Sequence, residues 1–187
     1  MAGDSYADWL KEELGGVVDD LELHDRQKRY LRSRWLDQIV WLEGAAKRNQ
    51  RRYYTLRLVA IIGGVIVPAL VSLNVRKDDV ASAIAWTTFA VSLVVAAAVA
   101  VEEFFHYGDR WRHYRRSAEL LKGEGWQYFE LTGAYAGHRT HASAFRTFAA
   151  GVEGVIGEDV ADYLTHVTKE RARSGEAEAE AEPVPDA

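Results

Sequence analysis

Residues 80–101 read VASAIAWTTFAVSLVVAAAVAV, a run of 22 positions without an ionisable side chain. A helix needs about 20 such residues to cross the hydrocarbon of a bilayer. The polar side chains in this run are hydroxyls, which can bond back to the carbonyls of their own helix. A soluble chain of this size rarely has a helix that is apolar on every face for six turns. The run therefore predicts a transmembrane helix, in preference to the buried central helix of a soluble all-α domain.

A second apolar block precedes the first. Residues 58–73 read LVAIIGGVIVPALVSL, and only residues 74–79 separate the two blocks. This block is shorter, but Arg57 can run its apolar stem along the helix and place its charge at the interface. The sequence thus predicts an all-α membrane protein: a two-transmembrane helical hairpin, with helices over 58–73 and 80–101, and a cytoplasmic helical bundle.

Lysine and arginine flank both outer ends of the predicted hairpin. The flanking cations are Lys47, Arg48, Arg51, Arg52 and Arg57 before it and Arg110, Arg112, Arg115, Arg116 and Lys122 after it. The connecting loop has only Arg76 and Lys77, beside two aspartates. Because excess Lys and Arg mark the cytoplasmic side, we expect a plasma (inner) membrane protein with both termini cytoplasmic.

The rest of the chain divides by charge and helical period. Residues 1–24 form an acidic N-terminal segment with no signal-peptide core. They hold a short amphipathic helix that Gly15-Gly16 should end. Residues 25–57 predict one cytoplasmic helix that leads into the membrane.

After the second crossing, residues 102–173 predict cytoplasmic helices. The helical period continues directly from the crossing into EEFFHYGDRWRHYRR, and three glycines between 151 and 157 should divide the last helix. Residues 174–187, SGEAEAEAEPVPDA, predict a disordered acidic tail. The chain has no cysteine, which excludes disulfides and thiolate metal sites.

Three stretches resemble a known family. They are RYLRSRWLDQIVWLEGAAKRNQRRYY before the first crossing, IIGGVIVPAL within it, and FHYGDRWRHYRRSAELLKGEGWQYF after the second. Their order and spacing around two crossings, over roughly residues 26–170, resemble the DUF4231 family within the SLATT group of two-transmembrane bacterial proteins. The resemblance implies a membrane effector, of a pore-forming kind, in nucleotide-linked bacterial conflict and defence systems. It carries over no catalytic residue.

The crossings contain two features of interest. Pro68 removes the hydrogen bond to the carbonyl of Gly64, so Gly63, Gly64 and Pro68 form either a close-packing surface or a candidate hinge. In the second crossing, small side chains recur at three- and four-residue steps. This candidate pore-lining or helix-packing face is Ala81, Ala85, Thr88, Ser92, Ala96 and Val99.

Charged residues follow where the second crossing ends. Glu102, Glu103 and Asp109 are ordinary solvated acids in one interpretation. Repeated around a symmetric assembly, they would form an acidic ring that concentrates monovalent cations at a pore mouth. Further on, Arg115 and Glu119 stand four apart and form a candidate ion pair of the bundle.

Catalytic and cofactor chemistry has no support in the sequence. His138 and His141 lack a further ligand at helical spacing and are better read as surface histidines. GVEGVIGED lacks the Lys and Ser/Thr of a phosphate loop. The cationic flanks are better explained by topology and acidic lipid than by nucleic acid. We therefore expect no enzyme, metal or cofactor.

A single hairpin encloses no water path, so a pore requires a homo-oligomer in the lipid bilayer. The sequence favours an oligomeric, ion-conducting or pore-forming effector. The alternative is a non-conducting, membrane-anchored scaffold whose cytoplasmic bundle binds a protein partner. A cytoplasmic protein or a nucleotide signal is the expected partner.

Overall fold

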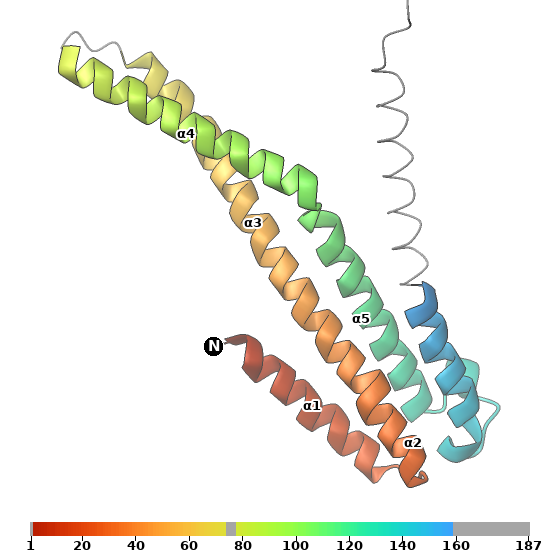
Figure 1. Ribbon diagram of the computed structural model, residues 1–187. Coiled ribbons are helices and arrows are strands. Elements are labelled where there is room, and N and C mark those ends of the chain that lie inside the picture. Colours follow the sequence, from red (N-terminus) through yellow and green to blue (C-terminus); the bar gives the residue numbers. More distant parts are fainter. Residues whose placement is uncertain (1, 74–77, 159–187) are drawn as a thin grey trace, which may run out of the picture. The chain divides into compact units, whose positions relative to one another are not determined.

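The described part of the chain forms helices and no strands, which confirms the predicted all-α class. A computed structural model describes residues 2–73 and 78–158 (Figure 1). The elements are α1 (Ala2–Asp20), α2 (Asp25–Tyr30), the π-helical segment η1 (Leu31–Leu36), α3 (Asp37–Ser72), α4 (Asp78–Phe105), α5 (Tyr107–Phe129), the 3₁₀ turn η2 (Gly133–Tyr135) and a helix over residues 141–158. The tail predicted over 174–187 and most of the predicted loop lie outside the described residues.

Helix continues without interruption from Asp25 to Ser72, as predicted for the segment that leads into the first apolar block. The π-helical segment η1 within it was not predicted. It contains Trp35, which is fully buried and donates its indole N–H to the Leu121 carbonyl at 2.8 Å. Pro68 lies inside α3, which remains helical to Ser72.

The helices form two compact units: residues up to 10 with 40–116, and residues 11–39 with those from 117 onward. The boundary between the units falls within α1, α3 and α5. The first unit contains both apolar blocks. The second contains most of the large fully buried side chains, including Trp35 and Tyr128.

In the first unit, α3 and α4 pack in opposite directions (Figure 1). A Cβ on Gly63 would overlap Val95, and near the other end Leu70 lines a groove with Ile84. Along α3, one series of buried or partly buried positions repeats in steps of three and four: Leu42, Ala46, Asn49, Tyr53, Leu56, Ala60, Gly63, Val67 and Leu70. Those of α4 repeat in the same way: Ile84, Thr88, Val91, Val95 and Ala98. Such a heptad pattern is typical of coiled-coil packing.

An aromatic core holds the second unit together. The rings of Tyr128 and Phe148 stack with centroids 4.4 Å apart. A Cβ on Gly125 would overlap the indole of Trp35, so this glycine lets α5 approach the tryptophan. Tyr128 also donates its hydroxyl to the carbonyl of His141 at 2.9 Å. These contacts fix the helix over 141–158 against α5.

Two predicted helix breaks at glycines are wrong. α1 continues through Gly15-Gly16 to Asp20, because Leu14 and Val18 are buried on either side of the pair. A glycine costs a helix only about 1 kcal/mol, which such burial offsets. The helix over 141–158 likewise passes through Gly151, where a Cβ would overlap Glu124. That glycine therefore serves close packing.

The helical period continues beyond the second crossing, with an interruption at one residue that the sequence did not indicate. α4 ends at Phe105 and α5 begins at Tyr107, because His106 adopts a left-handed conformation with φ 49°. A non-glycine residue rarely takes this conformation. Close packing beyond the break accompanies it: a Cβ on Gly108 would lie 2.8 Å from the Tyr53 ring.

Candidate functional site

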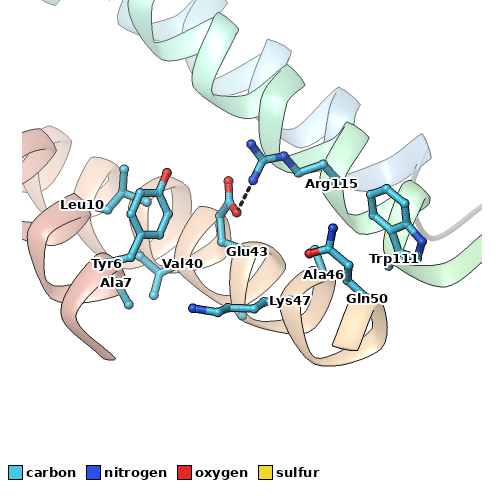
Figure 2. Close-up of a pocket in the computed structure, with 11 residues that line it drawn as sticks. Tyr6, Ala7, Leu10, Val40, Glu43, Ala46, Lys47, Gln50, Trp111 and Arg115 are labelled. Carbon is cyan, nitrogen blue, oxygen red and sulfur yellow. Dashed lines mark hydrogen bonds and ion pairs between the residues drawn. The ribbon is translucent and has the colours of Figure 1, made fainter. Parts of the chain in front are cut away.

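A pocket of about 470 Å³ lies in the first unit, among α1, α3 and α5 (Figure 2). Its lining comprises Tyr6, Ala7, Leu10, Val40, Glu43, Gly44, Ala46, Lys47, Gln50, Trp111 and Arg115. Apolar side chains form its α1 side, and α3 contributes a carboxylate, an ammonium and an amide. The pocket therefore combines an apolar wall with charges of both signs.

The pocket is organised by an ion pair between α3 and α5. Arg115 Nη1 donates to Glu43 Oε2 at 2.8 Å, as the dashed line in Figure 2 shows. The Glu43 side chain is 10% exposed and that of Arg115 is 49% exposed. A carboxylate so little exposed requires hydrogen-bond donors, since burying it without them costs several kcal/mol. Glu43 and Arg115 thus join α3, ahead of its apolar block, to α5, which follows the apolar helix α4.

Trp111 closes one side of this pocket. Its ring lies 6.5 Å from that of Tyr54, centroid to centroid. Its indole N–H is buried and has no hydrogen-bond partner within the described part of the chain. A buried, unmet donor is uncommon in native structures.

Two further ion pairs lie within α5. Arg112 donates to Asp109 at 2.6 Å, and Lys122 to Glu119 at 3.1 Å. From the sequence, Glu43 is one of three acids, with Asp37 and Glu119, that could meet the like-charged Arg112 and Arg116; in the structure Glu43 pairs with Arg115. The pairing of Arg115 with Glu119 stays a prediction.

A second cluster that the sequence did not reveal lies in the other unit. Glu153 accepts two hydrogen bonds from Arg34, at 2.9 and 2.7 Å, and one from the Tyr30 hydroxyl at 2.8 Å. The hydrogen bonds from Arg34 lower the pKa of Glu153 to about 2. Burial, followed by the bond to Glu153, raises the pKa of Tyr30. Residues separated by over 100 positions give no sequence signal for such a cluster.

The candidate pore-lining or helix-packing face of α4 is divided between two environments. Ala81, Thr88 and Ser92 are partly covered, and they line an apolar groove of about 480 Å³ with the end of α3. Ala85 also lines this groove but is exposed, and Ala96 and Val99 are exposed outside it. The Thr88 hydroxyl donates to the Ile84 carbonyl at 2.8 Å, and Thr87 bonds to Ala83 in the same way. Both threonine hydroxyls are thus satisfied within their own helix.

The three acids of the candidate ring lie on both sides of the break at His106. Glu103 is exposed, and Glu102 is partly covered, with Oε1 3.4 Å from the position of a Cβ on Gly108. Asp109 carries its ion pair to Arg112. Glu103 and Asp109 are therefore the exposed members of the set.

The two glycines of the candidate hinge have different surroundings. Gly63 is buried against Val95, whereas a Cβ on Gly64 would meet nothing within 4 Å. Gly63 is thus the glycine that allows close approach of α4. A hinge at Gly63, Gly64 and Pro68 stays a prediction.

His141 is engaged within the fold, with Nε2 2.9 Å from the carbonyl oxygen of Phe129. Within residues 2–73 and 78–158, no three His, Asp or Glu side chains are grouped so as to hold a metal ion.

The two apolar helices leave most of their surface uncovered. The helical stretches Asp25–Ser72 and Asp79–Phe105 are long and apolar enough to cross a membrane. Only 6% of the most apolar 18 residues of each is buried within the chain. The central helix of a soluble domain would be largely covered. These features define the class: an all-helical protein with two helices suited to a membrane and a polar bundle beside them.

The chain belongs to the DUF4231 family. Residues 37–143, more than half of the chain, match the family described as "Protein of unknown function (DUF4231)". The match covers both apolar helices, the break at His106 and all of α5. It confirms the family resemblance read from the sequence; the SLATT grouping stays a prediction. No curated protein and no solved structure matches the chain.

Proposed function

We propose that this chain is an integral membrane protein that crosses the bilayer twice, through α3 and α4. The observation that carries the proposal is the exposure of both apolar helices. Large side chains such as Val65 and Trp86 are each 70% exposed. Burial of apolar surface contributes about 25 cal/mol per Å², so this much uncovered apolar area strongly favours lipid over water. The cations at both outer ends support an orientation with both termini in the cytoplasm.

The membrane form is a homo-oligomer that conducts ions or permeabilises the bilayer. One chain has no polar path through its apolar helices, since the hydroxyls of Thr87 and Thr88 bond to their own helix. Several copies around an axis could enclose such a path. The exposed small residues Ala85 and Ala96 allow close contact, and exposed Glu103 would supply the acidic mouth. The effector role in this proposal comes from the predicted SLATT grouping.

Planar-bilayer recording of the reconstituted full chain tests this function. The wild type should pass cations in preference to anions. Glu103→Gln should lower cation conductance most at low salt, where screening is weakest. Glu130→Gln, an exposed acid of the other unit, is the matched control. Current that Glu103→Gln leaves unchanged would place the path elsewhere. Added nucleotides test a nucleotide trigger in the same recordings.

The alternative is a non-conducting membrane scaffold whose bundle binds a protein partner. The pocket around Glu43 and Arg115 favours it, because an apolar wall beside charges of both signs can receive a peptide side chain. Correctly assembled protein that carries no current at varied voltage, pH and nucleotide would establish this alternative over the pore.

A further inference from the structure

The first turn of α5 presents an unusual stack of side chains. The guanidinium carbon of Arg52 lies 5.5 Å from the centre of the Tyr107 ring, and the Phe105 ring stacks on Tyr107 with centroids 5.3 Å apart. Arg110 follows Tyr107 by three positions on α5, so the two side chains are neighbours on the helix surface. The Arg52 guanidinium of α3 thus lies over the Tyr107 ring, and Arg110 of α5 follows on the same side of its helix.

This stack depends on the break at His106. With His106 in the left-handed conformation, Tyr107 is buried at the start of α5 and Gly108 lies under Tyr53. Arg52 is the residue before Tyr53 on α3. The same close contact that seats α5 against α3 thus brings the Arg52 guanidinium over the Tyr107 ring.

Within residues 2–73 and 78–158, these arginines have no counter-charge. Arg52 and Arg110 are both exposed, and no carboxylate within the described residues lies at ion-pair distance from either. The nearby Asp109 is instead paired with Arg112. A guanidinium held on an aromatic face keeps its N–H edges free for a planar or tetrahedral anion.

The position along the chain indicates the source of that anion. Arg52 stands six residues, about 9 Å of helix, before the apolar block that begins at Leu58. Exposed aromatic side chains lie at the same end of the spans, including Tyr54 and Phe104. Such residues mark the interface of a bilayer, and lipid phosphates lie at its outer side.

We propose that Arg52 and Arg110, ordered by Tyr107, bind the phosphate of an anionic phospholipid headgroup, while Phe105 contacts the lipid's apolar part. The proposal rests on the membrane insertion proposed above. Arg51 and Arg57 on the same helix add to the attraction without belonging to the site. Guanidinium binds phosphate through two parallel hydrogen bonds, which suits a headgroup phosphodiester.

Native mass spectrometry of the full chain, released from nanodiscs of mixed phosphatidylglycerol and phosphatidylcholine, tests the site. The wild type should retain phosphatidylglycerol in preference to phosphatidylcholine. Arg52→Gln and Arg110→Gln should each lower that preference about fivefold, the effect of one arginine near an anionic surface. Arg139→Gln removes an exposed arginine of the other unit and should leave the preference unchanged.

Two further variants distinguish a specific phosphate-binding site from a diffuse electrostatic attraction. Arg52→Lys keeps the charge but loses the planar stack, and Tyr107→Leu removes the ring; both should lower the preference. Unchanged lipid ratios in all four variants of the site, with intact helix content, would overturn the proposal. So would equal retention of the two lipids by the wild type, or loss of the preference on adding inorganic phosphate. Failure of the chain to enter the nanodisc would instead contradict the membrane proposal itself.

Discussion

Arg115 on α5 lies 2.8 Å from Glu43 on α3, and the glutamate is almost fully withdrawn from solvent. The contact is asymmetric, because the arginine remains half exposed. Water screens the Arg115 side, so the pair itself contributes little more than a surface ion pair. Removing Arg115 matters more, because it leaves the little-exposed Glu43 carboxylate with fewer hydrogen-bond donors.

Arg115→Gln should therefore destabilise the bundle by about 1–3 kcal/mol, since it leaves the Glu43 carboxylate less well satisfied. Arg112→Gln should cost less than about 0.5 kcal/mol, because Arg112 and Asp109 are both exposed. Thermal unfolding of the two variants in detergent measures the difference. Equal effects would mean that Glu43 does not depend on Arg115. The double variant Arg115→Gln with Glu43→Gln should recover part of the loss.

Neighbouring glycines of α3 should respond oppositely to the same substitution. A Cβ on Gly63 overlaps the stiff side chain of Val95, so Gly63→Ala should weaken α3–α4 packing by about 1–3 kcal/mol. Gly64→Ala meets nothing within the chain and should leave this packing intact. The rate of cysteine cross-linking between α3 and α4 reports on it. If Gly64→Ala were the more disruptive change, Gly64 would face another copy.

Assembly should depend on a different face of α4. Ala85→Leu and Ala96→Leu enlarge exposed positions and should weaken the oligomer by about 1 kcal/mol or more per site. Ala98 is only 6% exposed, so Ala98→Leu should disturb the packing of a single chain instead. Size-exclusion chromatography with light scattering separates the outcomes. Oligomers unaffected by both exposed substitutions would exclude this face from the interface.

Acid should weaken the second unit through Glu153. Its pKa is lowered from 4.5 to about 2 by Arg34, so the cluster contributes stability above pH 4.5 that is lost as the pH falls toward 2. Glu153→Gln should lack this pH-dependent step and be less stable than wild type at neutral pH. Both side chains are nearly half exposed, which limits the effect to about 1 kcal/mol. Glu130→Gln is the control; parallel pH profiles for wild type and Glu153→Gln would contradict the linkage.

The sequence predicted what depends on composition over long windows. An uncharged run such as 80–101 leaves few alternatives to a long apolar helix, and the continuous helix from Asp25 follows from uninterrupted periodicity. The predictions that failed concern features that depend on tertiary contacts. Burial of Leu14 and Val18 keeps helix at Gly15-Gly16, against local propensity. The break at His106 accompanies the packing of Gly108 on Tyr53, which no local pattern reveals.

The candidate site shows the same limit. The sequence named Glu43 as one acid that could meet Arg112 and Arg116, but it could not select Arg115 as the partner. That choice depends on the rotation of α5 about its axis, and the left-handed His106 changes this rotation. Which residues come together around the pocket is therefore determined by the packing of the helices, and the sequence pattern alone does not reveal it.

The most direct measurement is the structure and stoichiometry of the full chain in lipid nanodiscs by cryo-electron microscopy. A closed symmetric ring of copies is expected, with α3 and α4 of each within the lipid and both termini on one side. A monomer that remains soluble without detergent would contradict the membrane assembly, and so would a ring whose apolar helices are covered by protein and meet no lipid.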